Sequence, residues 1–183
     1  LLEERIGSAI LNRLVEPNTV LYNAILYFVI VALAEESSKY LLMKRRTWGN
    51  PEFNCQYDGV VYAVFVSLGF ALWENISYVY QYGVSTALIR AVTAVPGHAC
   101  FGVFMGAWYG MARREANLGN YDKSRLDRLF AVLIPMLLHG TYDFIATRTE
   151  DSYTWIFLVF VAVLFFISFK LIKNLSANDR YIG

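Results

Sequence analysis

Seven polar or ionisable side chains lie within long apolar runs of this chain, at helical spacing from one another. They are Glu35, Glu36, Glu74, Asn75, His98, His139 and Asp143, and the two histidines are the only ones in the protein. An ionisable side chain at the centre of a bilayer costs roughly 2.5–3.5 kcal/mol on insertion scales. Because such costly groups recur in four separate runs, we interpret them as one intramembrane chemical site that four helices assemble.

Glu35 and Glu36 are adjacent carboxylates, and Lys39 follows them along the same helix. Residues three and four positions apart are neighbours on a helix, so the ammonium group of Lys39 can reach either carboxylate. Two adjacent carboxylates at low dielectric do not both ionise freely, so one pairs with Lys39 and the other is a candidate general base. A Glu–Lys pair that only holds helices together is the alternative interpretation.

The two histidines stand in motifs that can orient an imidazole. His139 and Asp143 are four residues apart, so they share one face of a helix. A carboxylate beside an imidazole fixes its tautomer and raises its basicity, as it does for catalytic and metal-bound histidines. His98 follows Pro96 and Gly97, and we expect this proline to break the third apolar helix. The alternatives are a structural His–Asp pair and a histidine that is satisfied within the core.

Small residues recur at every fourth position in two of the runs, which is typical of closely packed membrane helices. They are Ala63, Ser67, Ala71 and Asn75 in one run, and Gly102, Gly106 and Gly110 in the other. We expect Asn75 to hydrogen-bond across a helix interface. Glu74, about 100° away around the helix, then faces a different neighbour. Together Glu74 and Asn75 would complete the polar wall of the site, unless Glu74 is merely a protonated partner in an interhelical hydrogen bond.

The composition is typical of a polytopic membrane protein. The chain has 183 residues, of which 57% are hydrophobic and 17% are charged, whereas average soluble proteins are about 45–50% apolar and about 25% charged. A membrane-spanning helix needs about 20 apolar residues. Five runs reach that length, at residues 20–43, 58–80, 85–111, 126–147 and 153–172. The predicted fold is therefore an all-α, polytopic membrane helix bundle.

The charges divide the chain into three segments and orient it. Residues 1–17 alternate charge with apolar positions Leu2, Ile6, Ile10 and Leu14, which predicts an amphipathic helix lying in the membrane interface. We expect residues 18–175 to form the transmembrane catalytic bundle and residues 176–183 a cytoplasmic tail. Lysines and arginines follow the first, third and fifth runs, so the positive-inside rule puts the 44–57 and 112–125 loops and the C-terminus in the cytoplasm. The chain begins at a leucine, so we also expect a segment upstream of it.

Taken together, the motifs resemble those of the PrsW family of intramembrane proteases, which are similar to the CAAX prenyl endoprotease and bacteriocin-processing superfamily. The matching elements span about residues 20–147 and are Glu35-Glu36-x-x-Lys39, Phe70-x-x-x-Glu74, His98 and His139-x-x-x-Asp143. The second motif of the wider superfamily usually ends in histidine, whereas this chain has a glutamate there, as in the PrsW branch. The His-Glu-x-x-His pair of zinc proteases and the nucleophile motif of rhomboid-type serine proteases are absent.

The resemblance implies an endopeptidase of the bacterial inner membrane that cuts a membrane-anchored protein within or near the bilayer. By the same resemblance, the substrate is a single-span anti-sigma factor at its first cleavage site. The expected partners are that substrate and the lipid bilayer, with no nucleic acid. The sequence leaves the oligomeric state open.

Two versions of the chemistry are compatible with these residues. In the version that we prefer, Glu35 or Glu36 activates a water without any cofactor, and His98 and His139 stabilise the oxyanion or position the water. Replacing either glutamate or His139 should then abolish cleavage. In the other version, His98, His139 and one glutamate hold a catalytic Zn²⁺. The sequence does not choose between them.

Two functions from other classes compete with proteolysis. Intramembrane carboxylates and histidines also form proton relays in transporters and channel subunits, although the chain has no inverted repeat with paired interrupted segments. A passive structural protein would not need so many paired ionisable groups. A conservative Glu→Gln change separates these classes, because a protease loses its activity and a scaffold tolerates the change.

Overall fold

The computed structural model describes residues 2–17, 19–148 and 150–182. Residues 1, 18 and 183, where the predicted segments 1–17, 18–175 and 176–183 begin or end, lie outside the described residues, as does the side chain of Leu2. The helices in chain order are α1 (Leu2–Leu11), α2 (Val20–Ala24), η1 (Ile25–Ala32), α3 (Leu33–Thr47), α4 (Asp58–Tyr82), α5 (Val84–Val92), α6 (Ala94–Asn117), α7 (Tyr121–Ala146) and α8 (Asp151–Ala177).

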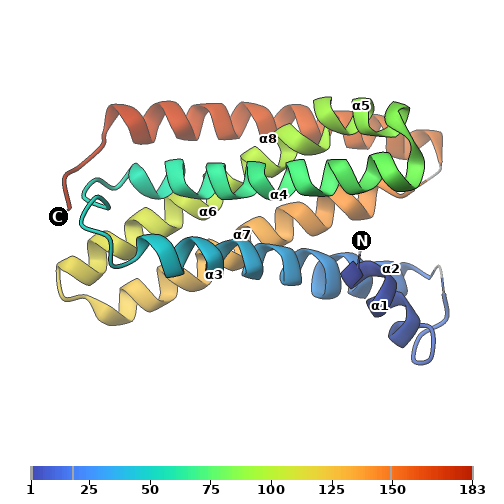
Figure 1. The fold of residues 1–183 in the computed structure, drawn as a ribbon, viewed down its shortest axis with the longest axis horizontal. Coiled ribbons are helices and arrows are strands. Elements are labelled where there is room, and N and C mark those ends of the chain that lie inside the picture. Colours follow the sequence, from blue (N-terminus) through green and yellow to red (C-terminus); the bar gives the residue numbers. More distant parts are fainter. Residues whose placement is uncertain (1, 18, 149, 183) are drawn as a thin grey trace.

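Five helical stretches of the described chain are long and apolar enough to cross a membrane, which confirms the predicted all-α polytopic bundle. They are Val20–Thr47, Asp58–Tyr82, Val84–Asn117, Tyr121–Ala146 and Asp151–Ala177. Each overlaps one of the runs predicted from the sequence. In Figure 1 the long helices lie roughly side by side, with α6 and α7 crossing the space between α4 and α3.

The first span contains a π-helical segment. Thr19 caps its start by accepting a hydrogen bond from the backbone N–H of Tyr22 at 3.1 Å, and α2, η1 and α3 then continue without a break. A π-helix has a wider turn than an α-helix and is frequent beside functional sites. Here η1 ends at Ala32, shortly before Glu35 and Glu36, so the wide turns determine which face of the span carries the two carboxylates.

The third span is broken as expected at Pro96, with the interruption at Thr93, three residues before the proline. α5 ends at Val92, α6 begins at Ala94, and Thr93 between them has φ −118° and ψ −66°. Pro96 lies in the first turn of α6. The first backbone N–H groups of a helix have no acceptor within it, so a proline there removes no hydrogen bond.

The small-residue faces of α4 and α6, each of which the sequence indicated as a close-packing face, pack against each other. Ala63 and Ser67 are fully buried. A Cβ atom on Gly102 would lie 2.8 Å from Ser67 Oγ, and one on Gly106 would collide with the backbone of Val60. Because these glycines have no side chain, the two helix backbones approach closely and fix His98 relative to Glu74.

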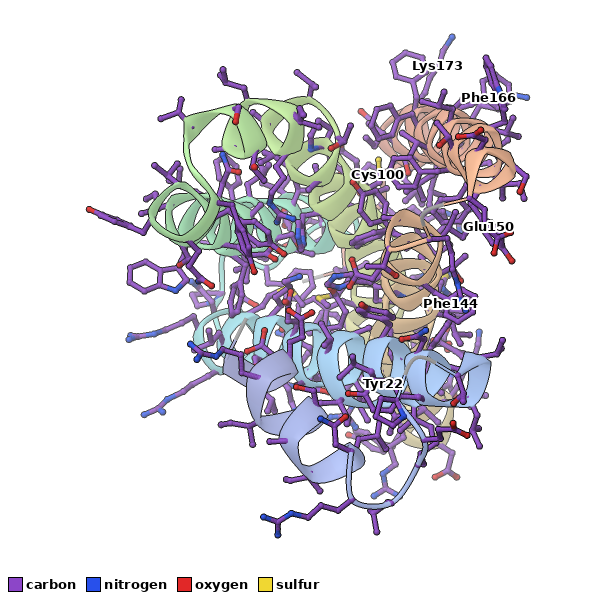
Figure 2. The ribbon with its side chains drawn as sticks, turned by 90° about the vertical axis from the view of Figure 1, so that its right-hand side faces the viewer. Tyr22, Cys100, Phe144, Glu150, Phe166 and Lys173 are labelled. Carbon is purple, nitrogen blue, oxygen red and sulfur yellow. The ribbon has the colours of Figure 1, made fainter. Side chains whose placement is uncertain are left out.

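α8 lies at the edge of the bundle. Only 11% of its most apolar stretch is buried, and Phe166 and Lys173 point away from the other helices (Figure 2). α1 lies at the opposite edge and packs on η1 through Leu11, which leaves Ile6 and Ile10 exposed. The four helices between these edges, α3, α4, α6 and α7, carry the candidate site.

Candidate active site

Four helices bring almost all of the candidate residues into one buried cluster. They are Glu35, Glu36 and Lys39 from α3, Glu74 from α4, His98 from α6, and His139 and Asp143 from α7. Counting along the sequence places the two α3 glutamates nearer the positively charged end than the histidines. In the structure the side chains of both α3 glutamates nevertheless reach the level of His139.

Lys39 lies at the centre of the cluster, and its side chain is fully buried. Its Nζ donates hydrogen bonds to Glu36 Oε1 at 2.7 Å and to Glu35 Oε2 at 3.2 Å. A third contact, of 3.0 Å, joins Nζ to His98 Nδ1. The ammonium group therefore contacts both carboxylates of α3 and links them to α6.

His98 is the neutral histidine of the pair. An ammonium group only donates hydrogen bonds, so Nδ1 of His98 accepts from Lys39. Its proton is then on Nε2, which donates to Glu74 Oε2 at 3.0 Å. Glu74 thus fixes the tautomer of the α6 histidine, while the inner nitrogen of the ring faces the cluster.

His139 is the charged histidine. Its Nδ1 lies 2.9 Å from Glu36 Oε1, and its Nε2 lies 3.3 Å from Asp143 Oδ2. Each ring nitrogen therefore faces a carboxylate, an arrangement that favours the doubly protonated imidazolium form. The Phe101 ring stacks on it with centroids 5.0 Å apart and shields it from the side.

Sequence reasoning missed Arg90 of α5, which ion-pairs with Glu74 at 2.9 Å between Nη2 and Oε2. Its guanidinium also lies 3.7 Å from the centroid of the Tyr78 ring, which holds it in place. The available signal was that Arg90 is the single arginine or lysine between positions 81 and 112. With Arg90 included, three cationic groups face four carboxylates, so the cluster as described carries one negative charge in excess.

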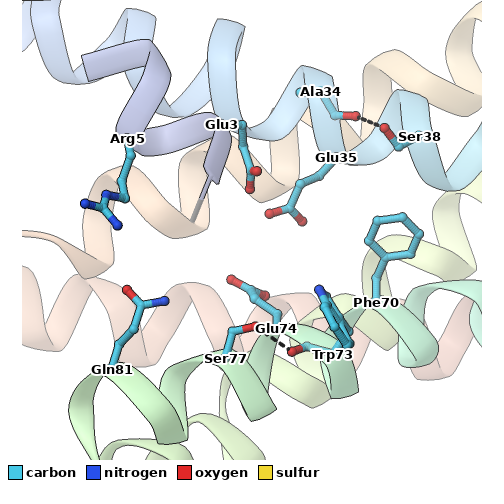
Figure 3. Close-up of a pocket in the computed structure, with 10 residues that line it drawn as sticks. All are labelled: Glu3, Arg5, Ala34, Glu35, Ser38, Phe70, Trp73, Glu74, Ser77 and Gln81. Atoms are coloured by element: carbon cyan, nitrogen blue, oxygen red, sulfur yellow. Dashed lines mark hydrogen bonds between the residues drawn. The ribbon is translucent and has the colours of Figure 1, made fainter. Parts of the chain in front are cut away.

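A cleft of about 540 Å³ opens between α3 and α4 beside the cluster. Figure 3 shows Glu35 and Glu74 facing each other across it from the two helices. A smaller cavity of about 70 Å³ shares these two residues and continues inward to His98 and His139. Glu36 lines neither space, whereas the Glu35 side chain is 11% exposed. The cleft therefore reaches the cluster at Glu35.

Two further residues differ from what the sequence indicated. Asn75 does hydrogen-bond across a helix interface, donating to the carbonyl oxygen of Ala87 at 3.3 Å. It lines neither the cleft nor the inner cavity, so Glu74 forms that wall without it. Glu4 of α1, which the sequence did not single out, also lines the inner cavity, and burial raises the pKa of its carboxyl group.

The donor set at the centre fits a metal ion. Glu35, Glu36, His98 and His139 each offer one ligand atom, and these atoms all lie within 4.8 Å of one another. Glu36 Oε2 is buried and has no hydrogen-bond partner within the described part of the chain. The outer ring nitrogens are held by Glu74 and Asp143, as is usual for metal-bound histidines. Binding would require Lys39 to leave the centre and His139 to lose a proton.

Comparison with known proteins gives one consistent family. Residues 4–170 match the PrsW-protease family, described as "PrsW family intramembrane metalloprotease". A protein named Protease PrsW from Oceanobacillus iheyensis is 39% identical over 82% of this chain and 67% of its own length. Proteins of the same name from Bacillus subtilis (39% identical, 83% of this chain and 66% of its own) and Clostridioides difficile (35%, 88% and 67%) are similar. The chain thus spans about two thirds of the length of these relatives. No solved structure matches it.

Proposed function

The chain belongs to the PrsW family of intramembrane proteases, and from this premise we propose that it hydrolyses a peptide bond of a single-span membrane protein. The observation that carries the proposal is the convergence of a carboxylate, an ammonium group and an imidazolium beside one cleft between two membrane helices. A carboxylate serves as a general base, and fixed cations stabilise an oxyanion.

We propose Glu35 as the general base. Of the two adjacent glutamates, Glu35 lines both the cleft and the inner cavity, so a water and a substrate carbonyl can approach it. Glu36 is fully buried, and its Oε1 is shared between Lys39 and His139. Glu36 therefore holds the two cations in place, while the carboxylate of Glu35 stays accessible.

The reaction follows from these positions. Glu35 takes a proton from a water, and the water oxygen forms a bond to the carbonyl carbon of the substrate. Negative charge develops on the carbonyl oxygen beside His139, which lines the inner cavity and stabilises the charge. The C–N bond then breaks, and the amine nitrogen leaves with the proton that Glu35 had taken. The carboxylate of Glu35 is thereby restored for the next cycle.

A zinc-dependent version of the same function is the second candidate, because the carboxylate and imidazole donor atoms of the cluster lie close enough together to hold a metal ion. His98, His139 and either Glu35 or Glu36 would hold the ion. When bound, Zn²⁺ would supply Lewis-acid polarisation of the substrate carbonyl. In this version Lys39 is not part of the chemistry, since it would have to turn away from the centre.

We propose the substrate and the orientation from the resemblance and the charges. The substrate is a single-span protein of the anti-sigma factor type, in the bacterial inner membrane. The ends of α3 and α6 and the C-terminal segment carry clustered arginines and lysines, so this end of the bundle faces the cytoplasm. The cleft between α3 and α4 is the route by which the substrate reaches Glu35.

The test combines the metal content of the purified full chain in detergent with cleavage of a single-span reporter, with and without a chelator. We expect chelator-resistant cleavage by protein that contains no stoichiometric metal, and loss of cleavage in Glu35→Gln. Stoichiometric zinc with chelator-sensitive cleavage would instead select the metal version.

Lys39→Met separates the two versions further. In the glutamic version this variant loses activity, because the Lys39 ammonium group that contacts Glu35 and Glu36 is gone. In the metal version it keeps its metal and its activity. Full cleavage activity of Glu35→Gln would contradict Glu35 as the general base, whereas no cleavage by the unmodified chain would favour a function outside proteolysis.

A further inference from the structure

A cavity of about 910 Å³ lies at the end of the bundle opposite α1, where α6 ends. Its lining includes Arg113, Arg114 and Arg180 together with Phe53, Tyr181 and Ile182. We call it the arginine pocket. In Figure 1 it belongs to the left-hand end of the molecule, beside the C-terminal segment. It shares no lining residue with the cleft or with the inner cavity of the candidate active site.

Three segments that are far apart in the sequence form its walls. The C-terminal segment folds back onto the loop before α4, where Gln56 N–H donates to Arg180 O at 2.9 Å and Ile182 N–H donates to Asn54 O at 2.7 Å. The side chain of Asn117, at the end of α6, donates to the carbonyl oxygen of Ile182. These bonds fix the positions of arginines that come from different parts of the chain.

The three guanidinium groups have no carboxylate partner among the residues that the structure describes. Arg113 lies between two aromatic rings, 5.6 Å from the Trp48 centroid and 5.8 Å from the Phe53 centroid, and its Nε is buried without a partner. The carboxylate of Asp179, the residue before Arg180, is already engaged. Asp179 Oδ1 accepts from the backbone N–H groups of Tyr57 and Arg180.

We propose that the arginine pocket binds the phosphate group of an anionic lipid. Guanidinium groups match phosphate oxygens through paired hydrogen bonds. Basic pockets at the cytoplasmic ends of membrane helices are suited to anionic head groups. The pocket lies where the third span ends at Asn117, which is the level of lipid phosphates, and the apolar Phe53 and Ile182 beside the arginines suit the start of an acyl chain.

The experiment measures binding of soluble short-chain lipids to the purified full chain in detergent. Dioctanoyl phosphatidylglycerol is compared with dioctanoyl phosphatidylcholine and with inorganic phosphate. We expect saturable binding of the anionic lipid that is at least about 10-fold tighter than binding of the other two. Equal binding of both lipids overturns the proposal, and so does inorganic phosphate that binds as tightly as the anionic lipid.

Variants locate the binding. Arg114→Gln combined with Arg180→Gln should weaken phosphatidylglycerol binding about 10-fold or more. Arg45→Gln combined with Arg46→Gln is the matched control, because it also removes two positive charges, from exposed positions at the same end and outside the pocket. Thermal unfolding checks that all variants are folded. If the control loses as much affinity as the double variant, the effect is general charge and the pocket is not the site.

Discussion

At the scale of single residues, the two adjacent glutamates have different surroundings. Glu36 is enclosed by protein and contacts both a lysine and a histidine, whereas Glu35 borders the cleft. The sequence presents them as equivalent neighbours. The structure supports a division of roles in which Glu36 organises the cluster and Glu35 is accessible to act on a water.

Glu35→Gln and Glu36→Gln should therefore fail in different ways. We expect Glu35→Gln to lower the cleavage rate by about 10²–10⁴, the usual contribution of a general base, with its unfolding temperature unchanged. Glu36→Gln removes the fully buried carboxylate that contacts both Lys39 and His139, so it should also lower the free energy of unfolding by about 3–5 kcal/mol. Reporter cleavage and thermal unfolding in detergent measure both effects. An unchanged stability of Glu36→Gln would refute the division of roles.

Arg90 offers a second test at this scale, because its ion pair with Glu74 holds the carboxylate that orients His98. Arg90→Gln should lower kcat about 10–100-fold with little change in KM, since His98 loses its fixed orientation. Arg90→Lys should recover part of the rate. Arg148→Gln is the control, because Arg148 lies against the Phe144 ring and has no ion pair within the described chain. Equal rates for Arg90→Gln and the control would rule out the positioning role.

Most of the cluster could be predicted from the sequence because its members are costly to bury and recur at helical spacing. A lone ionisable side chain in an apolar run, such as His98, has to find a partner within the bundle. Arg90 was missed because its contact with Glu74 depends on where the third span bends. No local pattern marks Thr93 as that point.

At the scale of secondary-structure elements, the contact between α4 and α6 sets the distance from Glu74 to His98. This contact has no space for a methyl group at Gly106, whereas a Cβ atom added to Gly69, on the open side of α4, would meet no other atom within 4 Å. The same substitution at the two positions therefore tests close packing against intrinsic helix preference.

Gly106→Ala should lower the free energy of unfolding by about 1–3 kcal/mol, because the helices must move apart to accept the methyl group. Gly69→Ala should be neutral or stabilising by up to about 1 kcal/mol, since alanine favours the helix more than glycine does. Denaturant or thermal unfolding in detergent measures both. If both variants behave alike, the close approach of α4 and α6 does not limit stability.

Some features of the helices could be predicted from the sequence and others could not. Length and apolarity predicted all five spans, because a bilayer requires them. The π-helical turns of η1 were not predicted, since they depend on how the first span packs against α7 and α1. Pro96 predicted a break in the third span, but not that the break falls at Thr93, which leaves the proline in the first turn of α6.

At the scale of the whole molecule, the distribution of basic residues predicts the orientation. In a Cys55→Ser background, a cysteine at Gln81 should react with a membrane-impermeant maleimide in intact cells. A cysteine at Gly49 should react only after the membrane is permeabilised, because the basic residues at that end keep it inside. The native Cys100 is buried and gives a low background. Reversal of the two labelling patterns would invert the proposed topology.

The distribution of the cluster over four helices also bears on how the protein is made. Chains enter the membrane from their N-terminus, so the carboxylates and the lysine of α3 are in place well before α7 delivers His139. Until then the bundle contains the proposed base, Glu35, but lacks the imidazolium of His139, and under the proposed function it cannot cleave a substrate. If His139 acts as proposed, a newly made chain becomes competent only when the span that carries this histidine has inserted.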